Sequence, residues 1–97
     1  MQYQFKYIRL GDASLAYIEH GHGAPVVFVH GSGPTDLRTW ERQIEPFATR
    51  FRVIAYSRRY HYPNPATGDL AGITSTRVHA RDLADLIIAL GLGRVHL

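Results

Sequence analysis

The residues best suited to chemistry lie between positions 26 and 34, where an apolar run leads into a glycine-rich turn. The run Val26–Val29 is followed by His30, Gly31, Ser32, Gly33 and Pro34. Acyl transfer needs hydrogen-bond donors fixed where negative charge develops, and backbone N–H groups of a glycine-rich turn supply them without side-chain bulk. The order and spacing therefore predict an oxyanion-binding loop.

A phosphate-binding loop is the main alternative for a glycine-rich turn after a strand. Gly31-Ser32-Gly33 lacks the third glycine of a dinucleotide fingerprint, and no Gly-Lys-Ser/Thr follows it. Pro34 also removes an amide that a phosphate would use. Nucleotide binding is therefore disfavoured.

The six histidines raise the possibility of a metal site. His20 with His22, or His61 with Asp69, could supply ligands, but neither pair has the spacing of a zinc finger or of two ligands on one helical face. We therefore expect no metal site and no cofactor.

The elements that must position this loop begin with an antiparallel hairpin. Tyr3, Phe5 and Tyr7 alternate with polar or opposite-facing residues, which predicts a half-buried strand over Tyr3–Leu10. A turn at Gly11 and Asp12 leads to a second strand at Leu15–Ile18. The consecutive apolar residues Val26–Val29 instead predict a strand covered on both faces, as in parallel sheets.

A helix is predicted after the loop at 30–37, because Trp40, Ile44 and Phe47 fall at helical spacing. Thr39 is its expected N-cap. Pro46 is expected to end or kink the helix near Glu45, leaving Phe47 and Ala48 in a separate turn.

A β-α-β unit follows from the strand predicted at Phe51–Tyr56. The polar segment 57–76 predicts a long loop, and the next helix carries an apolar stripe with Gly91 as its C-cap. That stripe consists of Leu83, Leu86, Ile87 and Leu90. Arg94–Leu97 opens a further β-like run, so the predicted order is β-β-β-α-β-α-β in a three-layer α/β architecture. The unpaired newest strand suggests a truncated sheet.

Composition adds weaker constraints. The 97 residues suit one small domain, and 45% hydrophobic with 20% charged residues is typical of soluble globular proteins. The net charge of +3 is spread along the chain, which disfavours nucleic-acid binding. The chain has no cysteine, no signal peptide and no membrane span, so a soluble cytoplasmic protein is expected.

The stretch Val-Val-Phe-Val-His-Gly-Ser-Gly-Pro resembles the His-Gly motif after the third strand of α/β-hydrolases, and the resemblance extends over essentially the whole chain. It implies that the N–H of Ser32 donates to the oxyanion, with Gly33 in support. It also implies that His30 and Gly31 are structural residues of the loop. In the family, the strand beginning at Arg94 leads into the nucleophile elbow.

The segment after the fourth predicted strand departs from the family pattern. Where the family has Arg followed by Gly-x-Gly-x-Ser, this chain has Ser57-Arg58-Arg59-Tyr60-His61-Tyr62-Pro63-Asn64, with Arg58 at the arginine position. Arg58 and Arg59 could grip an anionic substrate, although a solvated or fold-stabilising pair is the simpler interpretation.

The resemblance implies that residues 1–97 are the N-terminal part of one α/β-hydrolase domain. The full-length enzyme would attack an ester, or a related acyl or carbon–carbon substrate, through a serine beyond Leu97. The chain itself would lack nucleophile, acid and base and be inactive alone. The alternative is a non-catalytic protein that binds or senses a small molecule on the same scaffold.

Overall fold

The computed structural model describes residues 3–31, 33–65 and 76–97. Its elements follow in the order β1 (Lys6–Leu10), β2 (Ala13–His20), β3 (Ala24–Val29), η1 (Leu37–Trp40), α1 (Glu41–Ala48), β4 (Phe51–Tyr56) and α2 (Thr76–Ala89).

The strands form one mixed sheet in the order β1-β2-β4-β3. β1 and β2 form the predicted antiparallel hairpin, β2 also pairs antiparallel with β4, and β3 pairs parallel with β4 across the crossover that contains α1. The last predicted strand, Arg94–Leu97, is confirmed only at His96, which pairs with β3 where the parallel run was expected to begin. His96 forms only an isolated parallel bridge to Val26, because two backbone hydrogen bonds alone join it to β3: Val27 N–H to His96 O and His96 N–H to Pro25 O.

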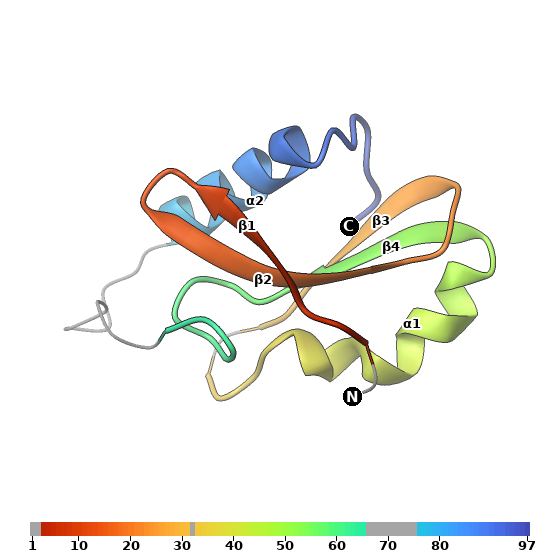
Figure 1. The fold of residues 1–97 in the computed structure, drawn as a ribbon, viewed down its shortest axis with the longest axis horizontal. Helices are drawn as coiled ribbons and strands as arrows, with labels where there is room; N and C mark the ends of the chain where they lie inside the picture. Colours follow the sequence, from red (N-terminus) through yellow and green to blue (C-terminus); the bar gives the residue numbers. More distant parts are fainter. Residues whose placement is uncertain (1–2, 32, 66–75) are drawn as a thin grey trace.

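Helices cover both faces of the sheet, which confirms the three-layer architecture (Figure 1). Side chains of α2 pack with one set of alternating strand residues, including Leu15, Ile54 and Tyr56. Leu37 of η1 and Ile44 of α1 pack with the opposite set. The core is therefore two apolar layers separated by the sheet.

The first two strands differ in detail from the prediction. β1 begins at Lys6, and Tyr7, expected to share the buried face with Tyr3 and Phe5, is 59% exposed. The buried face of β1 is instead Ile8 and Leu10, since the regular alternation starts only where the chain pairs with β2. β2 is longer than expected, and its centre is buried on both faces because Leu15 and Tyr17 pack in the layer of α2 while Ala16 and Ile18 pack in the layer of η1 and α1.

The prediction for the first helix was wrong at both ends. Asp36, not Thr39, caps the 3-10 turn η1, and its carboxylate accepts the Arg38 N–H at 2.9 Å. Pro46 lies inside α1, which continues to Ala48. Proline removes only one backbone hydrogen bond here, and the Phe47 ring holds the last turn by packing edge-on against Phe28.

The second helix agrees with the prediction. Leu86 is buried, and Leu83, Ile87 and Leu90 pack against the same core layer. Gly91 has φ +64° and ends the helix, with hydrogen bonds from Gly91 N–H to Ile88 O and from Leu92 N–H to Ile87 O. These two bonds define a Schellman cap, whose left-handed residue favours glycine.

Candidate active site

The carboxyl ends of the parallel strands β3 and β4 meet at one edge of the sheet, where both strands continue into loops (Figure 1). The loop after β3 carries the predicted oxyanion residues, and the loop after β4 carries the polar segment that begins at Ser57. Ligands in open α/β sheets bind outside the carboxyl ends of strands. This edge is therefore the candidate site.

His30 is the first residue of the β3 loop and is 2% exposed. Its Nε2 accepts the Arg58 N–H at 2.9 Å, so in the neutral ring Nδ1 carries the proton and donates to Gly31 O at 2.7 Å. Burial lowers the pKa of His30 to about 4, which keeps the ring neutral at pH 7. Both ring nitrogens thus bond to the backbone of the two loops.

The glycine-rich turn itself is only partly described. Ser32, the predicted oxyanion donor, lies outside the described residues. Gly33 is exposed, has φ +89°, and accepts the Thr35 N–H on its carbonyl oxygen at 2.8 Å. Within residues 3–31, 33–65 and 76–97, no backbone acceptor bonds to the Gly33 N–H.

Ser57 ties the two loops together from the end of β4. Its side chain is fully buried, and its Oγ accepts the Leu37 N–H at 3.0 Å while donating to Tyr62 O at 2.5 Å. The His61 Nδ1 lies 2.8 Å from Thr35 O in the β3 loop. The segment leading into η1 is therefore held against the β4 loop at two points.

Asn64 anchors the far end of the β4 loop to the middle of the sheet. Its Oδ1 accepts the Ala16 N–H of β2 at 2.9 Å, and its Nδ2 donates to Ser57 O at 2.8 Å and to Arg58 O at 3.2 Å. Asn64 is buried. These bonds satisfy polar backbone groups that would otherwise be buried without partners, which fixes the loop.

The two arginines after Ser57 have different environments. Arg59 forms a bidentate pair with the buried Asp82 of α2, at 2.9 and 3.0 Å, and also contacts the exposed Asp12. The hydrogen bonds to Asp82 and then Asp12 raise the pKa of Arg59. Arg59 thus links three elements and is a fold-stabilising residue, as the simpler interpretation predicted. The Arg58 Nη1 donates to His30 O at 3.3 Å.

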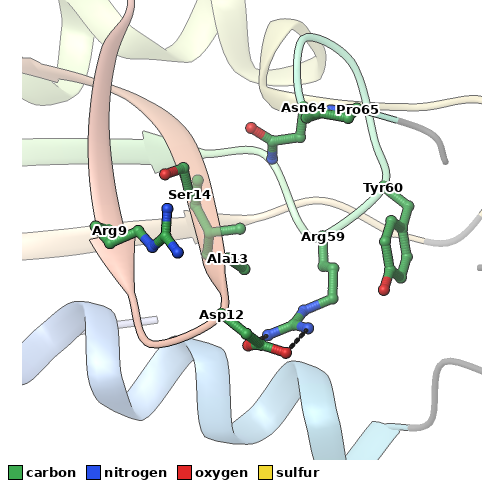
Figure 2. A pocket seen from close by; sticks show the side chains of 9 residues that line it. Arg9, Asp12, Ala13, Ser14, Arg59, Tyr60, Asn64 and Pro65 are labelled. Carbon is green, nitrogen blue, oxygen red and sulfur yellow. Dashed lines mark hydrogen bonds and ion pairs between the residues drawn. The ribbon is translucent and has the colours of Figure 1, made fainter. Parts of the chain in front are cut away.

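A pocket of about 330 Å³ lies beside this loop, between it and the turn joining β1 to β2. Figure 2 shows Arg9 and Ser14 on one side, Tyr60 on the other, and the Asp12–Arg59 ion pair between them. None of the described residues of the β3 loop lines this pocket. The ion pair also neutralises much of its charge, so it is distinct from the predicted oxyanion site.

Sequence reasoning missed the buried polar residues of this edge. Ser57 and Asn64 lie in a segment to which the sequence analysis assigned no role. The burial of Asp82 was not predicted, because nothing set it apart from the other charged residues of its helix. The one local signal was that Asp82 lies four residues before Leu86, on the same face of the helix as that member of the apolar stripe.

No metal site is found among the described residues, which hold no group of three or more His, Asp or Glu side chains placed to bind an ion. Across residues 3–31, 33–65 and 76–97, no helix is long and apolar enough to cross a membrane.

Comparison with known proteins shows which proteins share this fold. No protein-family model matches the chain. A protein of Azorhizobium caulinodans named "Putative carbamate hydrolase RutD" is 36% identical over 90 residues, which is 93% of this chain and 32% of that protein.

Solved structures agree on the fold. An α/β-hydrolase structure described among epoxide hydrolases from hot-environment metagenomes has a TM-score of 0.87 at 26% identity, covering 98% of this chain and 32% of the other. The structure of E-2-(acetamidomethylene)succinate hydrolase has a TM-score of 0.81 at 26% identity, covering 97% and 34%. These similarities show that the chain has the fold of the α/β-hydrolases, and it spans about a third of the length of these relatives.

Proposed function

We propose that this chain supplies the oxyanion loop of a serine-type α/β-hydrolase whose nucleophile, acid and base lie outside residues 1–97. The backbone N–H of Ser32 donates to the oxyanion, and Gly33 supports it. His30 and Gly31 hold the loop. The substrate is a small molecule carrying an ester or a related acyl or carbon–carbon bond, and the protein acts in the cytoplasm.

The anchoring of the loop carries this proposal. A donor stabilises a developing charge only if it is held in place before the reaction. At the start of the loop, the His30 ring accepts the Arg58 N–H. Beyond the end of the loop, the Ser57 hydroxyl accepts the Leu37 N–H. Between these two fixed points, the exposed Gly33 offers an N–H that no backbone acceptor of the described residues uses.

His30 is proposed as a loop anchor because its geometry leaves it no capacity for proton transfer. Its two ring nitrogens are engaged with backbone groups at 2.7 and 2.9 Å. Its pKa of about 4 also places it far from the pKa near the working pH that a general base needs.

The test replaces the Ser32 amide rather than its side chain. In the full-length protein, incorporating the α-hydroxy acid analogue of serine at position 32 turns the N–H donor into an ester oxygen. We expect kcat for a 4-nitrophenyl ester to fall by about 100- to 1000-fold, as for loss of an oxyanion donor elsewhere.

Ser32→Ala is the matched control, because it keeps the N–H and removes only the hydroxyl. Its kcat is expected to stay within about tenfold of the natural protein, a smaller loss than that of the missing donor. Equal losses in both variants would assign the effect to the side chain and contradict the proposal. Ligand binding without turnover in the natural protein would favour the non-catalytic alternative.

A further inference from the structure

Arg58 is the one half-buried arginine of the described chain without a carboxylate partner. Among the described residues, three arginines are half-buried: Arg52, Arg58 and Arg59. Arg52 pairs with Glu19 at 2.5 Å, and Arg59 pairs with Asp82 at 2.9 Å. Arg58 makes a single 3.3 Å side-chain hydrogen bond, to a backbone carbonyl.

This guanidinium lies at the start of the proposed oxyanion loop. The carbonyl that it contacts belongs to His30, so its Nη1 lies beside the first peptide of that loop. Its remaining N–H groups bond to no acceptor in the part of the chain that the structure describes. Arginine presents a planar fork of donors suited to a carboxylate.

The carboxylates near Arg58 already have partners. Asp36, whose charge acts on His30, bonds to Arg38 through both of its oxygens, and Asp82 pairs with Arg59. His30 and His61 pack with ring centroids 4.6 Å apart, and the positive charge of Arg58 acts on both His30 and His79, lowering the pKa of each. The carboxylate that reaches this corner from α2 is Asp82, and Arg59 binds both of its oxygens. The positive charge of Arg58 therefore has no local counterion among the described residues.

A half-buried arginine without a counterion is costly to keep, since burial disfavours an unpaired charge. An anion that arrives with the substrate would complete the missing pair. Because Arg58 lies beside the proposed oxyanion loop, an anion bound to it would belong to the same substrate molecule as the reacting carbonyl.

We propose that Arg58 is a specificity residue that binds a carboxylate of the substrate, so that the preferred substrates are small anionic acids bearing the scissile bond. This inference rests on the proposed function. The structural link between Arg58 and His30 Nε2 runs through the Arg58 backbone amide. A side-chain substitution therefore removes the charge and leaves that link in place.

The experiment compares an anionic ester with a neutral ester of the same shape in the full-length protein. The probes are 4-nitrophenyl hemisuccinate, which ends in a carboxylate, and 4-nitrophenyl 4-methylpentanoate, which ends in an isopropyl group. For Arg58→Met, the ratio of kcat/KM for the anionic to the neutral ester is expected to fall about 10- to 100-fold, the value of a charge-assisted hydrogen bond.

Two further variants sharpen the result. Arg58→Lys keeps the charge without the planar fork and is expected to recover part of the ratio. Arg42→Met removes a positive charge from the exposed surface of α1 and is expected to leave the ratio unchanged. A ratio in Arg58→Met equal to that of the natural protein, or no recovery in Arg58→Lys, would overturn the proposal.

Binding of succinate itself separates this proposal from the proposed function. If neither ester is hydrolysed, calorimetric titration with succinate still tests the anion site. Weaker binding by Arg58→Met than by Arg42→Met would sustain the Arg58 assignment while the hydrolase proposal fails. Equal binding by both variants, or no binding to the natural protein at millimolar succinate, would overturn it.

Discussion

Replacing Ser57 with alanine tests the hydrogen bonds that hold the β4 loop against the segment leading into η1. The hydroxyl is fully buried and satisfies two backbone groups, the Leu37 N–H at 3.0 Å and the Tyr62 carbonyl at 2.5 Å. Leu37 is itself 0% exposed, so its N–H would lose its acceptor with no access to water. Tyr62 is 53% exposed, which allows its carbonyl to be hydrated instead.

The expected loss in free energy of unfolding therefore comes mainly from the Leu37 amide. An unsatisfied buried backbone donor costs about 1–3 kcal/mol, and the Tyr62 carbonyl adds little because water can replace the serine. We expect Ser57→Ala to lower the free energy of unfolding by about 1–3 kcal/mol. The Leu37 amide is also expected to exchange with solvent at least about fivefold faster, the equivalent of about 1 kcal/mol.

The assay is urea denaturation of the protein that carries this chain, combined with amide hydrogen exchange. Ser14→Ala is the matched control, because Ser14 is an exposed serine of β2. If Ser57→Ala costs no more than Ser14→Ala and the Leu37 amide exchanges at its original rate, the loop is not held in the way described.

Three further predictions concern Asp82, His30 and Tyr60. Asp82→Ala is expected to cost about 3 kcal/mol in urea denaturation because it removes the buried bidentate partner of Arg59 and leaves only the exposed Asp12 to pair with that guanidinium. Asp12→Asn is expected to cost much less, since Asp12 is exposed, and equal losses would contradict this assignment. Because the fold lowers the pKa of His30 from 6.5 to about 4, its stabilising contribution is complete above pH 6.5 and is lost as the pH falls toward 4. His30→Asn is expected to flatten stability against pH over that window, and an unchanged slope would refute the buried neutral ring. Tyr60 has φ +69°, so Tyr60→Gly is expected to be about 1 kcal/mol more stable than Tyr60→Ala, and equal melting temperatures would contradict that backbone conformation.

The elements that local patterns specify were predicted well. The hairpin, the strand at Val26–Val29 and the stripe of α2 each follow from the spacing of apolar side chains, although only Val26 and Val27 of that strand are buried. The Gly91 cap follows from the need for a left-handed residue at the helix end. These features depend on residues close together in the chain, so local sequence patterns were enough to predict them.

The errors share a different cause. Pro46 remained helical because Phe47 packs against Phe28 of β3, a contact that no pattern within the helix indicates. Tyr7 became exposed because pairing with β2 determines the face of β1. In both cases a distant segment decided the local conformation.

The buried polar residues of the site were also beyond the reach of local patterns. Asn64 bonds to an amide 48 residues earlier, and Ser57 bonds to one 20 residues earlier. A serine or asparagine in a polar loop has the same appearance in the sequence whether it is exposed or buried. The glycine-rich loop was found because its glycines and its preceding strand are contiguous.

The central claim is that a backbone N–H at Ser32 faces the charge that develops in the reaction. The most direct measurement is a crystal structure of the full-length protein with an alkylboronate bound, because the boronate adds to the nucleophile and mimics the tetrahedral intermediate. The account predicts a boronate oxygen about 2.7–3.1 Å from the Ser32 nitrogen, the distance expected for an oxyanion donor. A boronate oxygen bound only by N–H groups of other loops, with the Ser32 amide turned away from it, would contradict the account.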